Sequence, residues 1–266
     1  MAERIRAVVT VKAYPAASVK YGESVCVAGI RTDVETPEWV RLYPVDYRDL
    51  PIDKRFAKYE EISLDVSASS DSRPESLRPD TTTIEVVRKI STGRDRTWRE
   101  RRRLVEPLVT ESMCAILEAE KRSGSSLGAF RPARVEDVIA SKEGDWTDRQ
   151  MDVLNQMTLF AQDKGALERI PWRFRYRYSC GGTCRGHEQS IIDWEIHQAY
   201  RSWRRDYGDA EAVERVRRKW LDELCGPSKD TIFFVGNQLR HREAFLVLGV
   251  FWPPRSENGE NLQFRF

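Results

Sequence analysis

Cysteine, histidine and long apolar stretches are all scarce in this sequence of 266 residues. No apolar run approaches the roughly 20 residues that a membrane-spanning helix needs, so we expect no membrane partner. The five cysteines are scattered and odd in number, which argues against a disulfide framework. The first residues contain no apolar stretch of the kind that secretory signals carry. We therefore expect a soluble, cytoplasmic protein.

Several familiar motifs are also missing. The sequence has no phosphate-binding loop, no Rossmann glycine pattern and no nucleophile elbow, which argues against the enzyme classes built on them. The net charge is only +2, so the chain is not basic throughout. Hydrophobic residues make up 40% and charged residues 32%, as in an ordinary globular protein. The length allows one large domain or two small ones.

The first 90 residues are rich in predicted strands. Apolar Ile62, Leu64 and Val66 alternate with polar neighbours, which is typical of a strand with one buried face. The predicted strands are 7–14, 24–30, 39–45, 61–67 and 83–89, and 67–80 is predicted to be a mobile loop. Five short strands favour a small β-barrel over 1–90, and the OB-type barrel is one candidate.

A short resemblance lies inside this region. The segment Cys26-Val-Ala-Gly-Ile, followed by Trp39-Val-Arg-Leu-Tyr, resembles the opening of bacterial proteins described as containing a dual OB domain. It covers about 25 residues and implies a barrel compatible with nucleic acid, but no activity. The alternative is that small residues stand here because two strands pack closely.

The rest of the chain is predicted to be a helical segment, 91–165, and an α+β domain, 166–266. Helices are expected at 95–105, 107–122, 190–207 and 209–225, and strands at 172–178, 231–235 and 244–252. The last two strands are apolar and joined by a loop, 236–243. The predicted fold class is therefore α+β, with an N-terminal barrel, a helical middle and a C-terminal α+β part.

The segment from Trp172 to Tyr178 alternates aromatic residues with Arg173, Arg175 and Arg177. Because side chains of a strand point alternately to opposite faces, the three guanidinium groups share one face. At about 6.6 Å spacing they could follow successive phosphates of DNA or RNA. We predict that the aromatic face is buried, since it is too apolar to leave open. The alternative is an amphipathic strand whose arginines only face water.

Further candidate nucleic-acid-binding residues come from other basic segments. Eight Lys or Arg stand between Arg88 and Arg103 against two acidic residues, and Arg99 and Arg102 belong to this run. Arg185 follows the arginine strand, and Arg240 and His241 lie in the loop between the two apolar strands. Solvated charged surfaces are the alternative interpretation.

A candidate metal site follows the arginine strand, in the segment Cys180-Gly-Gly-Thr-Cys184-Arg-Gly-His187. Thiolates and an imidazole close together on a glycine-rich turn are typical of a tetrahedral zinc site. This spacing supplies three ligands, and a fourth is expected from His197, Cys225, His241 or water. The alternative is a tight turn with two inert cysteines.

His187, Asp193 and Glu195 form a second candidate cluster, which could bind Mg²⁺ or Mn²⁺ and hydrolyse nucleic acid. The alternative is that Asp193 caps a helix while Glu195 faces solvent. The sequence thus leaves three functions open. They are a nucleic-acid-binding protein with a structural zinc, a metal-dependent nuclease, and a protein-interaction module whose tryptophans and basic faces meet an acidic partner.

Overall fold

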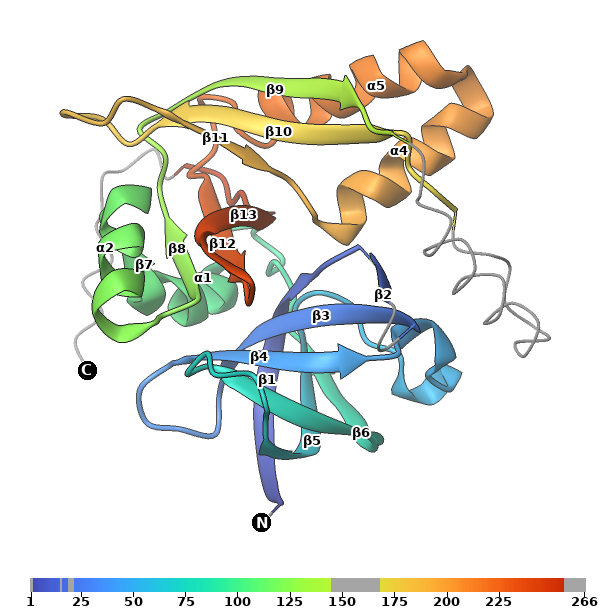
Figure 1. Ribbon diagram of the computed structural model, residues 1–266, viewed down its shortest axis with the longest axis vertical. Helices are drawn as coiled ribbons and strands as arrows, with labels where there is room; N and C mark the ends of the chain where they lie inside the picture. Colours follow the sequence, from blue (N-terminus) through green and yellow to red (C-terminus); the bar gives the residue numbers. More distant parts are fainter. Residues whose placement is uncertain (1, 15, 19–21, 145–167, 256–266) are drawn as a thin grey trace.

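The computed structural model describes residues 2–14, 16–18, 22–144 and 168–255. In Figure 1 a β-barrel occupies one end of the molecule and a sheet with two helices occupies the other, with further strands between them. Of the helices in these ranges, none combines the length and the apolar character that crossing a membrane requires.

Five strands close into the barrel: β1 (Glu3–Lys12), β3 (Gly22–Arg31), β4 (Trp39–Val45), β5 (Glu60–Ala68) and β6 (Ser76–Lys89). Their order is β1-β5-β6-β4-β3, and β1 also pairs with β3, which closes the barrel. β4 and β6 run parallel, and β2 (Ala16–Ser18) extends β3. Alternating residues such as Ile62, Leu64 and Val66 fill the interior. The five predicted strands and the barrel are confirmed.

The polar segment before β6 differs from the prediction. It is predicted to be a mobile loop up to residue 80, but β6 begins at Ser76, which pairs in parallel with Arg41. Arg73 is only 8% exposed, because it pairs with Asp71 and donates to the Asn237 carbonyl oxygen at 2.6 Å. Contacts with residues distant in the sequence therefore fix the segment between β5 and β6, and no local sequence pattern reveals these contacts.

The middle of the chain is only partly helical. The helices predicted at 95–105 and 107–122 form, but both begin later than predicted, as α1 (Arg99–Val105) and α2 (Met113–Ser123). The prediction of a helical segment over 91–165 is wrong where β8 (Leu127–Phe130) and β9 (Arg134–Lys142) follow. β8 lies inside a sheet and every residue in it is buried, so it shows no alternation that would reveal a strand. Residues 145–165 lie outside the described ranges.

The remaining strands form two sheets. In the first, β10 (Trp172–Ser179) lies between β9 and β11 (His187–Ser190). In the second, the order is β13-β12-β8-β7, with β7 (Val109–Thr110), β12 (Ile232–Gln238) and β13 (His241–Phe251). Strands β12 and β13 extend into the loop predicted at 236–243 and leave a short turn.

Two helices cover the first sheet, α4 (Trp194–Tyr207) and α5 (Asp209–Arg217), and a π-helical stretch, Arg218–Glu223, continues α5. The helix predicted from Ser190 starts four residues later, because β11 occupies 187–190 and Asp193 is the N-cap. The Asp193 side chain accepts a hydrogen bond from the Glu195 amide at 3.1 Å, as an N-cap residue does.

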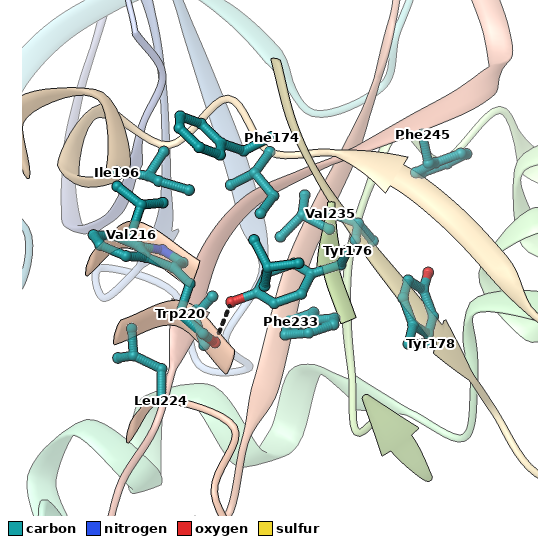
Figure 2. Close-up of a cluster of buried hydrophobic side chains, with 14 of the residues drawn as sticks. Phe174, Tyr176, Tyr178, Ile196, Val216, Trp220, Leu224, Phe233, Val235 and Phe245 are labelled. Carbon is teal, nitrogen blue, oxygen red and sulfur yellow. Dashed lines mark hydrogen bonds between the residues drawn. The ribbon is translucent and has the colours of Figure 1, made fainter. Parts of the chain in front are cut away.

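The aromatic face of β10 is buried, as predicted. Phe174, Tyr176 and Tyr178 have no exposed surface and pack against α4, the π-helical stretch and β12. Figure 2 shows Tyr176 between Trp220 and Phe233, with its hydroxyl group donating to the Trp220 carbonyl oxygen at 3.0 Å. The buried hydroxyl therefore has the partner that its burial requires.

The barrel packs on the second sheet through the residues of the dual-OB resemblance. Trp39 packs its ring edge-on against Phe234, with 5.7 Å between ring centroids, and Ala28 is fully buried in the same cluster. At Gly29 a Cβ atom would lie 2.6 Å from the Val8 carbonyl oxygen. The small residues of this motif stand where β1 and β3 approach closely and where the barrel meets β12.

Candidate metal centre

Four side chains from three elements converge at one end of the first sheet. Cys114 is the second residue of α2, Cys180 follows β10, Cys184 lies in the turn and His187 is the first residue of β11. Their ligand atoms all lie within 4.8 Å of one another. In the described ranges, these residues are the one group of three or more Cys, His, Asp or Glu that meets this distance. The group could hold a metal ion.

The distances match a tetrahedral ion. The Nε2 atom of His187 lies 3.3 Å from the Cys184 Sγ atom and 3.5 Å from the Cys114 Sγ atom. Around a tetrahedral zinc, with Zn–S of about 2.3 Å and Zn–N of about 2.1 Å, the S···N separation is about 3.6 Å. These two sulfur–nitrogen separations are therefore close to those that such an ion would require.

The glycines let the chain curl around the sulfur atoms. Gly181, Gly182 and Gly186 have φ angles of 82°, 56° and 92°, a left-handed conformation that favours glycine. The Cys184 amide donates to the Gly181 carbonyl oxygen at 3.2 Å, and the Gly186 amide points at the Cys184 sulfur at 3.4 Å. In Figure 1 this turn projects at the edge of the molecule.

The start of α2 contributes electrostatically to the site. Burial raises the pKa of the Cys180 thiol, and the backbone amides of Met113 and Cys114 oppose this by donating to its sulfur. Burial also raises the pKa of Cys114 to about 11, with further contributions from the neighbouring cysteines. Three thiols this close resist ionising together, so a bound cation would supply the positive charge that stabilises them as thiolates.

His187 is suited to be a neutral ligand. Burial lowers its pKa below the usual 6.5, so the ring is uncharged at neutral pH. Its ring stacks on that of Tyr178, with 5.2 Å between centroids, and this contact fixes the orientation of the imidazole. A neutral imidazole is the form that binds a metal ion.

The three residues expected as a possible fourth ligand lie outside this cluster. His197 is buried and stacks on Tyr14, Cys225 lies beside the Tyr176 hydroxyl, and His241 is exposed at the start of β13. Cys114 lies beside the other three donors instead, although it stands far upstream in a predicted helix. The one local signal is its place directly after the helix start, where Ser112 caps α2 by accepting from the Ala115 amide.

The proposed nuclease cluster does not assemble. His187 joins the cysteines, whereas the Asp193 carboxylate is buried and paired with the Lys58 ammonium group at 2.7 Å. Glu195 also pairs with Lys58, at 3.2 Å. Burial raises the pKa of Asp193 to about 6, and Lys58 opposes that rise. Asp193 is thus a capping residue and ion-pair partner, as the alternative interpretation held.

On the arginine face of β10, Arg173 and Arg177 are exposed and Arg175 is half-buried, and all three are accompanied by carboxylates. Arg173 pairs with Glu143, and Arg175 and Arg177 pair with Glu188 at 2.8 and 3.2 Å. Both of these acidic residues come from segments beside β10, so the sequence pattern of β10 alone does not reveal them.

The other predicted basic residues divide into two groups. Arg185 in the turn, Arg99 at the start of α1, and Arg240 and His241 beside the β12–β13 turn are exposed. Arg102 instead pairs with Asp230 at 2.6 Å and with Glu106 at 3.2 Å, which fixes α1 to the C-terminal part.

A family model described as Domain of unknown function (DUF8757) matches residues 109–265, and the chain belongs to this family. A second model, Domain of unknown function (DUF8758), matches residues 3–107. No curated protein matches the sequence. Among solved structures, the chain is similar to a murine DNA-binding protein bound to double-stranded DNA, with 8% identity over 96% of this chain and 97% of the other. The TM-score of 0.32 does not establish a shared fold.

Proposed function

We propose that this chain is a nucleic-acid-binding protein in which Cys114, Cys180, Cys184 and His187 hold a structural zinc ion. The observation that carries the zinc assignment is the convergence of three sulfur donors and one nitrogen donor. Four protein ligands close the coordination shell, as in structural zinc sites, whereas catalytic sites keep one position open. Mg²⁺ and Mn²⁺ prefer oxygen ligands and fit this donor set poorly.

The bound ion would join three elements. α2 supplies one ligand, the β10–β11 turn supplies two and the first residue of β11 supplies one, so the ion fixes the turn against the helix. It would also hold Arg185 at the edge of the arginine face. Metal binding in such sites contributes directly to folding, because the ligands are not preassembled in the unfolded chain.

Two features support a nucleic-acid partner. The closed barrel, with β4 and β6 parallel, supports the OB-like assignment that the resemblance implies. The barrel surface around Trp39 is covered by the second sheet, so we place one contact on the arginine face of β10. Exposed ion pairs contribute little, so phosphate groups can replace Glu143 and Glu188 as partners of the arginines.

The zinc assignment is tested by elemental analysis of protein that carries no histidine tag. We expect about one zinc per chain, lost in Cys114→Ser and Cys184→Ser but kept in Cys225→Ala, the matched control outside the site. A folded wild-type protein without metal and with titratable thiols at 114, 180 and 184 would contradict the assignment.

The nucleic-acid assignment is tested by fluorescence anisotropy with DNA and RNA oligonucleotides at several salt concentrations. We expect salt-dependent binding, because phosphate contacts release counterions. Arg173→Gln, Arg175→Gln and Arg177→Gln together should weaken it and flatten the slope of log affinity against log salt. Absence of binding to single- and double-stranded DNA and RNA at low salt would refute the function.

A further inference from the structure

A second basic surface lies where β6 ends and α1 begins. We propose that Lys89, Arg94, Arg96 and Arg99, here called the β6–α1 basic surface, form the principal contact with nucleic-acid phosphates. This inference rests on the proposed function, because it names the surface through which that function acts. The residues occupy the end of β6, the connecting turn and the first position of α1, and all four are exposed.

The basic segment 88–103 contains residues whose contacts stabilise the fold and residues that only face solvent. Arg88 pairs with Glu61 at 2.7 Å and with Glu100. The Arg101 guanidinium lies 3.9 Å from the centroid of the Tyr59 ring and donates to the Ile90 carbonyl oxygen at 2.8 Å. Arg102, as described above, is paired with acidic residues.

The residues of the β6–α1 basic surface do not make ion pairs of this kind within the described structure. Across the described part of the chain, none of these four side chains has a carboxylate within ion-pair distance. Asp95 is the acidic residue within the turn, and its carboxylate accepts hydrogen bonds from the Thr97 amide at 3.1 Å and the Thr97 hydroxyl at 2.9 Å. Apart from the electrostatic attraction between Asp95 and Arg99, the described residues leave the positive charge of this surface without an ion-pair partner, unlike the arginine face of β10.

The turn that carries these arginines has an unusual backbone. Gly93, Arg96 and Trp98 have φ angles of 80°, 56° and 60°, and the last two are not glycines. The Arg96 amide donates to the Gly93 carbonyl oxygen at 3.2 Å, and the Trp98 amide donates to that of Thr92 at 3.0 Å. The turn is thus held in a conformation that side chains normally disfavour.

A buried tryptophan fixes this turn to the body of the protein. The Trp98 side chain is 8% exposed, and its ring centroid lies 5.3 Å from that of Phe251 and 5.0 Å from that of Trp252. The conformation is therefore set before any ligand arrives. Left-handed backbone at a non-glycine residue is found preferentially at functional sites, where the surrounding structure maintains it.

Position 96 is the most informative one. Glycine would adopt its φ angle without strain, yet the chain carries an arginine whose side chain makes no ion pair within the described structure. A strained backbone that carries a side chain without an ion pair points to an external partner. A nucleic-acid backbone fits, because its phosphates are closely spaced and arginine binds phosphate with paired hydrogen bonds.

The test compares two triple variants of the full chain in the anisotropy assay. Arg94→Gln, Arg96→Gln and Arg99→Gln together should weaken binding roughly tenfold or more near physiological salt and lower the salt slope by roughly two to three units on duplex DNA. Arg173→Gln, Arg175→Gln and Arg177→Gln together should have a smaller effect. Wild-type affinity and slope in the first variant would overturn this inference and leave the proposed function intact. No binding by the wild-type protein would contradict the function itself.

Two controls separate binding from folding and from a different partner. Arg96→Gly removes the charge and relieves the backbone strain, so it should weaken binding while the melting temperature stays equal or rises. A fall in melting temperature with unchanged affinity would show a structural role instead. Polyglutamate with the same number of charges should compete poorly, and competition equal to that of nucleic acid would assign the surface to acidic proteins.

Discussion

At Gly29 the backbones of β1 and β3 leave no room for a side chain, since a Cβ atom would lie 2.6 Å from the Val8 carbonyl oxygen. Neither strand can move without opening the barrel. We expect Gly29→Ala to lower the free energy of unfolding by roughly 1–3 kcal/mol, measured by urea denaturation. Gly144→Ala is the control, because its Cβ would meet nothing within 4 Å, and its effect should stay within about 0.5 kcal/mol. Equal stability of the two variants would contradict the close approach of these strands.

His197 gives the protein a pH dependence of stability. Burial lowers its pKa from 6.5 to about 4, and its Nδ1 atom lies 2.8 Å from the Asp193 carbonyl oxygen. Between pH 4 and 6.5 the unfolded chain binds more protons at this residue than the folded one. The contribution of His197 to stability is therefore full above pH 6.5 and falls as the pH drops, by roughly 3 kcal/mol at pH 4.

The raised pKa of Asp193 makes stability change with pH in the opposite direction. We therefore isolate the contribution of His197 by comparing a variant at this position with the wild-type protein. We expect His197→Gln to be less stable than wild type at pH 7 and to approach or exceed it near pH 4. Chemical denaturation at both pH values measures the two differences. A difference that does not change with pH would show that His197 does not titrate on unfolding.

At the scale of elements, the proposed zinc ion should determine the local stability of the β10–β11 turn and of the start of α2. Removing the ion with a chelator should increase amide hydrogen exchange in both elements, because their link through Cys114 is lost. Exchange in the barrel strand β5 should not change, since the described structure places it at the other end of the molecule (Figure 1). Equal increases throughout the chain would instead indicate global unfolding.

The individual strands also show which features a short sequence pattern can predict and which it cannot. Strands β5 and β10 were predicted from apolar residues that alternate with polar ones, and the other barrel strands from short apolar segments between turn residues. β8 was missed because it is buried on both faces, and its neighbours come from distant parts of the chain. The segment 71–75 was predicted to be mobile, yet the Glu75 carboxylate accepts hydrogen bonds from the Ser126 amide and hydroxyl, both at 2.8 Å.

At the scale of the whole molecule, a buried ion pair joins the barrel to the C-terminal part. Lys58 precedes β5, and its side chain and that of Asp193 are 7% and 2% exposed. Lys58→Met would leave a buried carboxylate without its partner, so we expect a loss of roughly 3–5 kcal/mol in the free energy of unfolding. Thermal and urea denaturation would measure it.

A second substitution makes this prediction specific. Adding Asp193→Asn removes the unpaired charge and keeps a residue that caps helices well, so the double variant should recover part of the lost stability. A double variant less stable than Lys58→Met alone would show that the pair does not account for the loss. The same pairing explains why Asp193 and Glu195 form no catalytic site with His187.

The sequence by itself determined the features that depend on neighbours along the chain. The barrel strands, the buried aromatic face of β10 and the turn that brings Cys180, Cys184 and His187 together all follow from local spacing. Only the tertiary structure decided that Cys114 is the fourth donor, that Glu143 and Glu188 accompany the β10 arginines, and that the surface around Trp39 is covered. These contacts join residues that are far apart in the chain. Their energy depends on the distance between the side chains in space, and the periodicity of a short sequence segment carries no information about that distance.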